Sequence, residues 1–598
     1  MRKYLHKVFF ILSNQRRAQL ALLILASILA SILEAFGVGL IGPFLALVSD
    51  PTLLQSVPAL AALAQMLGLS SPSSVVVAAG VAVIALFCFK AIAYSVCKFL
   101  IYQFGYQQKR LIESRLLHTY LNIPYIFHLD HNTAEFIERI TIESDQFTTN
   151  SLIPLLEIVA NLFVMILLIA LLAYTDLSLL VISMAILLPA IFLFASCRHW
   201  VQAWGQQRSK NVQEMIREIN HGLGGLKETK VIGCEPFFQK RLDRSAQSFA
   251  KAATYTNTFH ILPKVFIETV LVIFLLVYIV GTTLLSDRSL DELVAVLGVF
   301  AVATIRLLPS ISQSLNNFGR MCESSYAVDM LYHDLREIER YGIPANRWNP
   351  SVLELPSAYS LVRQQSFQTI QLDRLTYRYP DAARAAIRDM TLTLRRGEAV
   401  AFIGRSGAGK TTLVDVLLGL LSPESGDILL DGVSIYKDMD RWRQMLGYIP
   451  QSIFLLDDTI EHNIAFGVPH EEIDPGRLRT AIQAAQLSEL LDSLPEGIHT
   501  RVGERGVKLS GGQRQRIGIA RALYHEREIL VLDEATSALD NETEQMITEA
   551  INVLAGSKTL IIIAHRLSTI EHCDRVYLLE QGEVKQYGSF QEVVGARV

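Results

Sequence analysis

Charged residues are scarce in this chain of 598 residues, because Asp, Glu, Lys and Arg make up only 19% of it, whereas hydrophobic residues make up 51%. The formal net charge of −4 provides no basic excess, so the composition does not indicate a nucleic-acid partner. Cysteine is also rare: the six cysteines form no C-x-x-C pair, which favours isolated thiols over a metal or redox motif. No low-complexity tract or short internal repeat is visible.

The first residues, MRKYLHKVFFIL, are basic and then apolar, but they lack the small-residue cleavage site of a signal peptide. We expect residues 1–17 to form an uncleaved amphipathic helix on the inner surface of a membrane. The chain is too long for one hydrophobic core. Apolar runs crowd before residue 320 and charge is richer after it. The sequence predicts an all-α transmembrane domain of six helices at 18–325, a linker at 326–365 and, where short strands and helices alternate, an α/β domain at 366–598.

Six apolar stretches are long enough to cross a bilayer, which requires about 20 mostly apolar residues. They lie at roughly 18–48, 75–104, 151–174, 177–197, 260–285 and 290–318. Lys and Arg gather before the first stretch, between the second and third, and between the fourth and fifth, whereas residues 50–74 contain neither. Because basic loops stay in the cytoplasm, we expect an integral membrane protein with both termini on the cytoplasmic side.

The two long basic connections show helical patterning. We therefore expect the membrane helices to continue beyond the bilayer on the cytoplasmic side. The tips of these extensions are predicted as short segments near 123–130 and 220–234.

Ionisable residues interrupt the predicted spans at Glu34, Lys90, Glu268 and Arg306, all at a similar depth from the outer ends. A charge that faces lipid is expensive, so these side chains are expected to face the bundle interior, a partner or water. Two interpretations stay open. The four residues form internal ion pairs that fix helix packing, or Lys90 and Arg306 line a cavity and meet an anionic group of a substrate.

Residues 404–412 (GRSGAGKTT) fit the phosphate-loop pattern G-x-x-x-x-G-K-[ST] and follow a buried strand. The glycines let backbone N–H groups surround phosphate oxygens, while Lys410 offers a charge to the β- and γ-phosphates and Thr411 a hydroxyl to Mg²⁺. The helix that opens at Thr411 adds a favourable dipole. The apolar run at 529–533 ends in Asp533, as in a strand that carries a metal-binding acid. The predicted nucleotide contacts of the loop are Gly404, Ser406, Gly407, Gly409, Lys410, Thr411 and Thr412.

A further motif, LSGGQ at 509–513, is not shared by phosphate-loop proteins in general. With the other motifs in this order, the domain resembles the ATP-binding-cassette (ABC) ATPases. The resemblance implies ATP and Mg²⁺ as cofactors and ATP hydrolysis as the activity. It further implies that Tyr379, or alternatively Tyr377, stacks on adenine, and that Asp533 and Gln451 contact the metal ion. Glu534 is implied as the general base and His565 as a contact of the γ-phosphate. The loop that ends at Asp540 is implied to contact the partner in a dimer.

The same motif implies a partner. In the family, the serine and glycines of LSGGQ contact the ATP that a second cassette holds, which here assigns Ser510, Gly511, Gly512 and Gln513 to the other chain's nucleotide. One chain carries six spans and one cassette, so it resembles half a transporter. A homodimer is the simplest assembly, and a heterodimer stays open.

The order of the domains and the stretch RVGERG at 501–506 resemble the exporter type. The stretch at 34–43, Lys90 and the stretch at 306–310 resemble bacterial flippases of lipid-linked oligosaccharides and related exporters of glycolipids. The expected function is therefore ATP-driven translocation of such an amphiphile from the inner to the outer side of the membrane. Export of peptides or hydrophobic drugs is the alternative, and an ATP-gated channel or regulator is a third hypothesis.

Overall fold

The computed structural model describes residues 2–12, 17–40, 44, 47–48, 72–175, 177–285, 290–341, 367–534, 541–564 and 566–595. The chain divides into two compact units, Met1–Ile123 with Phe127–Glu354 and Leu355–Val598 with Pro124–Ile126. The first is helical and the second contains two β-sheets. The predicted fold class, a helical domain followed by an α/β domain, is confirmed.

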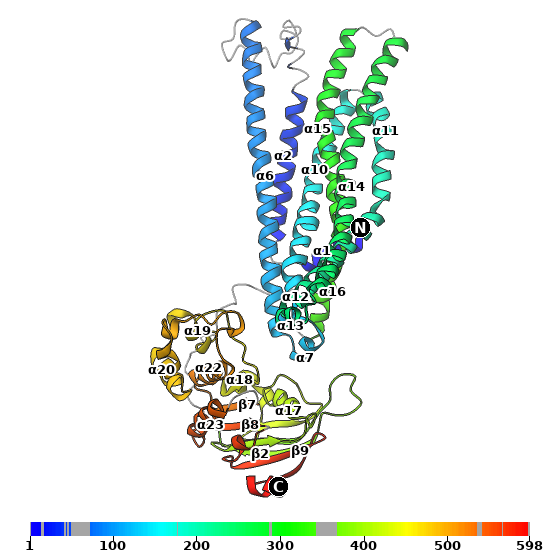
Figure 1. The fold of residues 1–598 in the computed structure, drawn as a ribbon. Coiled ribbons are helices and arrows are strands. Elements are labelled where there is room, and N and C mark those ends of the chain that lie inside the picture. The colour runs from blue at the N-terminus through cyan, green and yellow to red at the C-terminus, as the bar shows by residue number, and fades with distance from the viewer. Residues whose placement is uncertain are drawn as a thin grey trace. The chain divides into compact units, whose positions relative to one another are not determined.

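The described part of the first unit is built from long helices that run alongside one another (Figure 1). Each of the predicted apolar ranges lies mainly on one of them, namely α2, α6, α10, α11, α14 and α15, and the first range, 18–48, runs beyond the end of α2 at Gly39. The helices are α1 (Arg2–Ile11), α2 (Arg17–Gly39), α6 (Pro72–Asn122), α7 (Tyr125–Asp130), α8 (Thr133–Glu138), α9 (Ser144–Phe147), α10 (Ile153–Thr175), α11 (Leu177–Ser196), α12 (Arg198–Gly224), α13 (Leu226–Ile232), α14 (Glu235–Leu285), α15 (Leu290–Glu323) and α16 (Ser325–Arg340), with π-helical turns η2 (Arg139–Glu143) and η3 (Thr148–Leu152) before α10.

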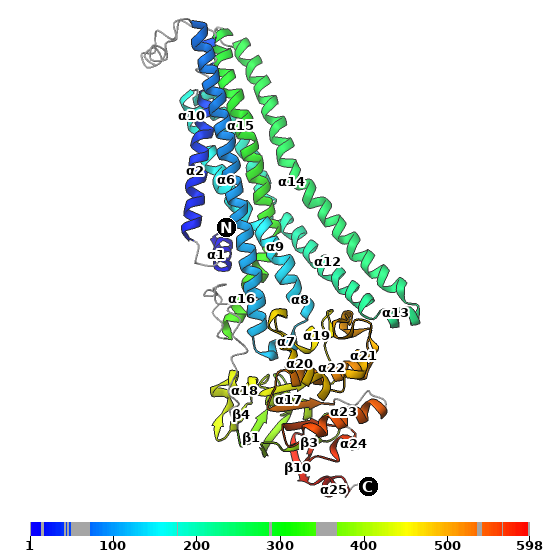
Figure 2. The same ribbon diagram turned by 90° about the vertical axis from the view of Figure 1, so that its left-hand side faces the viewer.

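Several helices are much longer than a bilayer requires. Among the described residues, Gln19–Gly39, Ser73–Asn122 and Thr133–Tyr174 are long and apolar enough to cross a membrane. Helix α6 has 51 residues, which at 1.5 Å per residue is about 75 Å, against about 30 Å for the hydrocarbon core. Short helices stand at both predicted tips, α7 after α6 and α13 between α12 and α14 (Figure 2). Short helices therefore stand at the two predicted positions, whereas the location of these helix ends beyond the bilayer on the cytoplasmic side stays a prediction.

The predicted N-terminal helix exists as α1, and it packs on the protein through one face. Val8 and Ile11 are fully buried, and the Lys7 ammonium lies 2.8 Å from the Asp329 carboxylate of α16. Helix α16 opens the range predicted as a linker and buries Leu331 and Leu335 beside α1. The location of α1 on a membrane surface stays a prediction.

The second unit contains a four-stranded sheet in the order β2-β1-β4-β5 and a six-stranded sheet in the order β10-β9-β3-β8-β7-β6. The strands are β1 (Thr369–Tyr377), β2 (Ile387–Arg395), β3 (Ala399–Ile403), β4 (Ser425–Leu430), β5 (Val433–Ser434), β6 (Leu446–Ile449), β7 (Ile529–Asp533), β8 (Thr559–Ile563), β9 (Arg575–Glu580) and β10 (Glu583–Gly588). The helices are α17 (Lys410–Leu417), α18 (Met439–Met445), α19 (Ile460–Ile464), α20 (Pro475–Ala484), α21 (Ser488–Ser493), α22 (Gly511–Tyr524), α23 (Asn541–Leu554), α24 (Leu567–Ile570) and α25 (Phe590–Val593), with 3₁₀ turns η5 (Ile435–Lys437), η6 (His470–Glu472), η7 (Gly497–His499) and η8 (Glu504–Gly506).

Both faces of the six-stranded sheet are covered, which explains why its central strands are apolar at nearly every position. Successive side chains of a strand point to opposite faces. In β7, Leu530 and Leu532 join a core that includes residues of α19, α20 and α22. Ile529 and Val531 join a second core, shared with the four-stranded sheet and α17. A strand that is buried on both faces carries apolar side chains on both, which explains the unbroken apolar run that precedes Asp533 in the stretch ILVLD.

Candidate functional site

The predicted nucleotide-binding residues lie at one edge of the six-stranded sheet. Strands β3, β8, β7 and β6 are parallel neighbours in that order. The phosphate loop follows β3, Asp533 ends β7, and Gln451 comes just after β6. Because the carboxyl ends of parallel strands meet at the same edge, motifs that are far apart in the sequence come together there.

Glycine is required in the phosphate loop by its backbone and its close contacts. Gly404 has φ +154° and Gly409 has φ +100°, both in the region that favours glycine. A Cβ atom would lie 2.3 Å from the Leu579 carbonyl oxygen at Gly404 and 2.5 Å from the Ala386 carbonyl oxygen at Gly409. The loop therefore keeps its backbone tightly curled, so that it can present N–H groups to an anion.

Lys410 begins α17, one residue earlier than the sequence predicted. Its side chain is only 6% exposed, and its ammonium donates to the carbonyl oxygens of Gly404 at 2.8 Å and Arg405 at 3.2 Å. Burial lowers the pKa of Lys410, while the nearby carboxylates of Glu534 and Asp533 oppose that shift. The cation is thus held inside the curl of the loop, at the positive end of a helix dipole.

The two acids after β7 differ in their surroundings. Asp533 is buried at the end of the strand. Glu534 has φ +48°, its N–H donates to the Ile563 carbonyl oxygen of β8 at 2.9 Å, and its carboxylate accepts from the Gln451 side-chain amide at 2.8 Å. A left-handed backbone is uncommon for glutamate. Three constraints therefore fix the Glu534 carboxylate beside the residue that follows β6.

Of the two tyrosines considered for adenine stacking, Tyr379 is the accessible one. Its hydroxyl lies 3.2 Å from the Thr412 hydroxyl of α17, and its ring is partly exposed. The Tyr377 ring is 5% exposed and belongs to the core beneath the phosphate loop. The two rings meet edge to face at a centroid distance of 5.1 Å. The buried Tyr377 ring thus packs against the Tyr379 ring and helps to hold it in place.

The LSGGQ motif forms the start of α22. The Ser510 hydroxyl accepts from the Gln513 N–H at 3.2 Å, and the Ser510 N–H donates to the Gln513 side-chain oxygen at 2.8 Å. This reciprocal cap fixes the first turn of the helix. Ser510 and Gly511 are exposed, whereas Gly512 is buried. The Gln515 side chain donates to the Pro450 carbonyl oxygen at 3.3 Å, so the same helix also holds the backbone next to Gln451.

Two of the four deep charges of the first unit form an ion pair. The Lys90 ammonium of α6 lies 2.8 Å from the Glu34 carboxylate of α2, and both side chains are largely buried. Glu268 on α14 is exposed. The backbone of Arg306 is part of α15, but its side chain lies outside the described residues.

Two family models match the chain, one described as ABC transporter transmembrane region at residues 20–306 and one as ABC transporter at residues 387–537. An ATP-dependent lipid A-core flippase of Cupriavidus metallidurans is 31% identical over 490 residues, which cover 79% of this chain and 78% of that protein. This chain belongs to the ABC transporter family.

Other relatives give the same picture. An ATP-dependent lipid A-core flippase of Bordetella avium is 30% identical over 78% of this chain and 76% of its own length. The structure of a bacterial Atm1-family ABC exporter with ATP bound has a TM-score of 0.73, at 24% identity and 97% coverage of both chains. The protein is an ABC exporter: its first unit is the membrane-embedded domain, and its second is an ATPase domain that couples ATP hydrolysis to transport.

Two predicted residues of the ATPase domain lie outside the described residues. They are His565, which follows β8, and Asp540, at the end of the stretch 537–540. Their assigned roles stay predictions. The other nucleotide-site residues are described, and those that follow β3, β6 and β7 share one edge of the sheet.

The sequence did not reveal a polar cluster around the buried Glu157 in the transporter's membrane domain. The Glu157 carboxylate accepts from the Lys98 ammonium at 2.6 Å, the Tyr102 hydroxyl at 3.2 Å and the Asn317 amide at 3.0 Å. A signal was present, because Lys98 and Tyr102 are four residues apart on one helix and polar pairs with this spacing share a face. Glu157 and Asn161 repeat the spacing.

Asp415 was also missed. It lies on α17 and is half-buried; burial, with the nearby Asp533 carboxylate, raises the pKa of Asp415 to about 6. Its place one turn after Thr411 was readable from the sequence, but its closeness to Asp533 depends on how α17 packs on β7.

Proposed function

We propose that this ABC exporter is a homodimeric flippase that moves a glycolipid, a lipid-linked oligosaccharide or a related amphiphile with an anionic headgroup from the inner to the outer leaflet of a bacterial inner membrane. The supporting observation is that relatives named ATP-dependent lipid A-core flippase align with about four-fifths of the chain, through both of its units. Both termini are proposed to lie in the cytoplasm.

In the ATPase domain, Lys410 is proposed to contact the β- and γ-phosphates and Glu534 to act as the general base for the attacking water. The hydroxyl of Thr411, the amide of Gln451 and the carboxylate of Asp533 offer hard oxygen ligands at one sheet edge. Mg²⁺ prefers such ligands, so this donor set fits a magnesium ion bound with ATP.

A second copy is proposed to complete each nucleotide site. Ser510 and Gly511 are exposed at the N-terminus of a 14-residue helix, where N–H groups and the helix dipole favour an anion. The reciprocal cap keeps this turn ordered before any partner binds. The exposed turn is therefore suited to contact the γ-phosphate of an ATP held by the partner's phosphate loop.

The substrate class is tested by ATPase stimulation in proteoliposomes. A lipid A-core glycolipid, a polyprenyl-pyrophosphate glycan, an apolar peptide and a hydrophobic cationic drug are compared at equal molar fractions. We expect the first two to raise turnover several-fold and to reach the outer leaflet only in the presence of ATP. Stimulation and transport restricted to the peptide or drug would contradict the proposed substrate.

A further inference from the structure

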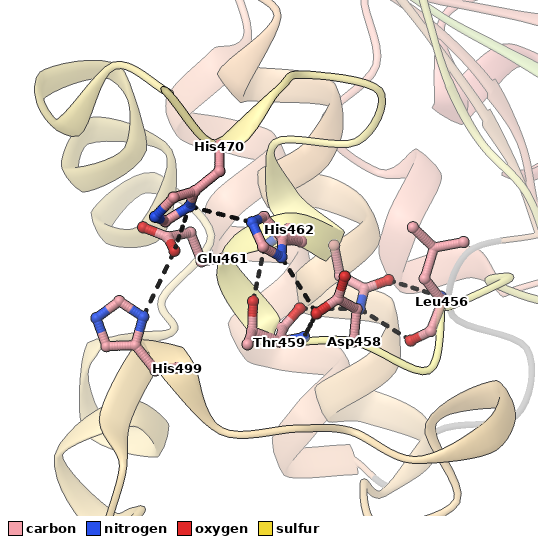
Figure 3. Close-up of polar contacts among 8 residues, drawn as sticks. Leu456, Asp458, Thr459, Glu461, His462, His470 and His499 are labelled. Atoms are coloured by element: carbon pink, nitrogen blue, oxygen red, sulfur yellow. Dashed lines mark hydrogen bonds and ion pairs between the residues drawn. The ribbon is translucent and has the colours of Figure 1, made fainter. Parts of the chain in front are cut away.

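Three histidines and a glutamate gather in the ATPase domain, in the segment between β6 and α22. Glu461 and His462 lie on α19, His470 opens η6, and His499 ends η7 (Figure 3). The Nε2 atom of His462 is 3.2 Å from Nδ1 of His470. The Oε2 atom of Glu461 is 3.8 Å from Nδ1 of His470 and 3.4 Å from Nδ1 of His499.

Two of these separations match those between the ligands of one small cation. With metal–ligand distances of about 2.0–2.1 Å, two ligand atoms of a tetrahedral zinc site lie about 3.3 Å apart. The His462–His470 and Glu461–His499 separations, 3.2 and 3.4 Å, are close to that value. The ligand atoms of Glu461, His462 and His470 all lie within 4.8 Å of one another, so small side-chain rotations bring them to a common centre.

A carboxylate behind the cluster orients one of the histidines. Nδ1 of His462 lies 3.1 Å from the Asp458 carboxylate, which also accepts from the Thr459 N–H at 2.8 Å. Nε2, the other ring nitrogen of His462, faces His470 (Figure 3). Histidines that bind metals usually donate their second nitrogen to such a carboxylate.

The backbone around the cluster is tied together. The Ile460 N–H donates to the Thr500 carbonyl oxygen at 3.1 Å, and the Val502 N–H donates to the Asp458 carbonyl oxygen at 3.0 Å. Helix α19 is thus fixed to the strand-like segment that follows His499. The cluster is accessible to ions from solvent on the side of His470 and His499, because their side chains are each 67% exposed.

We propose that Glu461, His462 and His470, with His499 as the fourth ligand, bind a divalent transition-metal ion of the zinc class. Imidazole with carboxylate suits zinc, nickel or copper, whereas magnesium and calcium prefer sites made of oxygen ligands alone. None of these residues belongs to the nucleotide site described above.

Such an ion joins α19, η6 and η7. Helix α19 packs on α22, where the Arg521 guanidinium donates to the Asn463 carbonyl oxygen at 2.8 Å. Segment 501–506 begins two residues after His499 and leads to Ser510. The bound metal therefore stabilises the part of the ATPase domain that carries the exposed turn of α22.

The test uses the full chain in detergent, with an affinity tag that contains no histidine, and without nucleotide or Mg²⁺. We expect equilibrium dialysis with Zn²⁺ to give one tightly bound ion per chain and Co²⁺ to give the visible absorption of a tetrahedral site. Zn²⁺ should raise the melting temperature, and a chelator should reverse the rise. His462→Ala and His470→Ala should each weaken binding at least tenfold and abolish the Co²⁺ absorption.

The matched control is His572→Ala, which removes an exposed histidine of the same domain and should bind like the wild type. Basal ATPase activity, measured separately with Mg-ATP, confirms that each variant is folded. Equal Zn²⁺ affinity in the wild type and in the His462→Ala/His470→Ala double variant would overturn the site and leave a hydrogen-bonded histidine pair. Unchanged affinity in His499→Ala would overturn its role as the fourth ligand.

Discussion

At the scale of single residues, the placement of Glu534 is the strongest geometric argument for its proposed role. A general base must hold an acceptor oxygen where a water can approach the γ-phosphate. The carboxylate is restrained by its own left-handed backbone and by the 2.8 Å hydrogen bond from Gln451. Such a restraint costs conformational free energy, and an acid on the surface with no function would not require it.

Replacement Glu534→Gln keeps the size and hydrogen-bonding shape of the side chain but removes its basicity. We expect steady-state ATP turnover to fall about 10²- to 10⁴-fold, the usual contribution of a general base. ATP binding should persist, because Lys410 and the loop N–H groups are intact. Single-turnover assays and retention of labelled ATP measure the two effects. The control Glu571→Gln changes an exposed acid and should hydrolyse normally; undiminished turnover in Glu534→Gln would rule out the assignment.

Variants of the Lys90–Glu34 pair can distinguish an ion pair that fixes helix packing from a lysine that meets an anionic group of the substrate. Lys90→Met or Glu34→Gln alone leaves one buried charge without its partner, which typically costs about 3–5 kcal/mol. The double variant removes both charges and should recover most of that stability in thermal unfolding. If the pair only fixes packing, lipid-stimulated ATPase recovers as well. If Lys90 meets an anionic headgroup, stability returns while stimulation by the glycolipid stays low.

At the scale of elements, α12 and α15 depend on one glycine for their close contact. A Cβ atom on Gly205 would lie 2.3 Å from the backbone oxygen of Glu323. The Glu323 carboxylate also receives Arg208 of α12 at 2.6 Å and His260 of α14 at 3.1 Å. Three helices therefore meet at this point, and backbone atoms cannot move aside as a flexible side chain would.

Gly205→Ala should destabilise the membrane domain by about 1–3 kcal/mol, the usual cost of overpacking. The control lies on the same helix: Gly224 has no atom within 4 Å of an added Cβ. Gly224→Ala should therefore be neutral or stabilise slightly, because alanine favours a helix over glycine. Melting temperatures in detergent compare the two variants, and equal values would contradict the close contact.

His525, which follows α22, makes the ATPase domain sensitive to acid. Burial, together with the nearby Arg527 guanidinium, lowers the pKa of His525 to about 4. The unfolded chain takes up this proton below an ordinary pKa of about 6.5. Between these values the unfolded state binds more protons, so stability is lost as the pH falls from about 6.5 to 4.

We expect His525→Gln to lose about 1–2 kcal/mol less stability than the wild type between pH 7 and pH 4.5. Melting temperatures over this range measure the difference. His572→Gln removes an exposed histidine and should retain the pH dependence of the wild type. Parallel pH curves for His525→Gln and the wild type would show that His525 does not contribute.

The elements were predictable because the sequence encodes them locally. Continuous apolar runs fixed the long helices, and the run at 529–533 fixed β7 to the residue. The nucleotide motifs could be joined because parallel strands end at one edge. Contacts between helices were not predictable, since they depend on how each helix is rotated about its axis. The Glu157 cluster and the Gly205 contact belong to this class, whereas the Glu461–His470 group depends on how the loop after α19 returns to that helix.

At the scale of the whole molecule, one chain offers one phosphate loop and one LSGGQ turn, and the proposed homodimer pairs each with its counterpart on the other chain. Symmetry then requires two identical composite sites, each built from both copies. Helix α22 connects the two halves of this scheme within one chain, because it presents Ser510 outward and holds the backbone beside Gln451 through Gln515.

Complementation between two defective chains tests the dimer. Lys410→Ala removes the cation that is proposed to bind phosphate, and Gly511→Asp places a negative charge at the exposed turn that should receive the partner's phosphate. Each variant alone should be inactive in both of its sites. When the two are expressed together, a mixed dimer contains one site with both defects and one with an intact loop facing an intact turn. ATPase activity should therefore reappear in mixed dimers isolated with two different tags. If each chain works alone, Gly511→Asp keeps wild-type activity by itself and mixing adds nothing beyond the sum of the two.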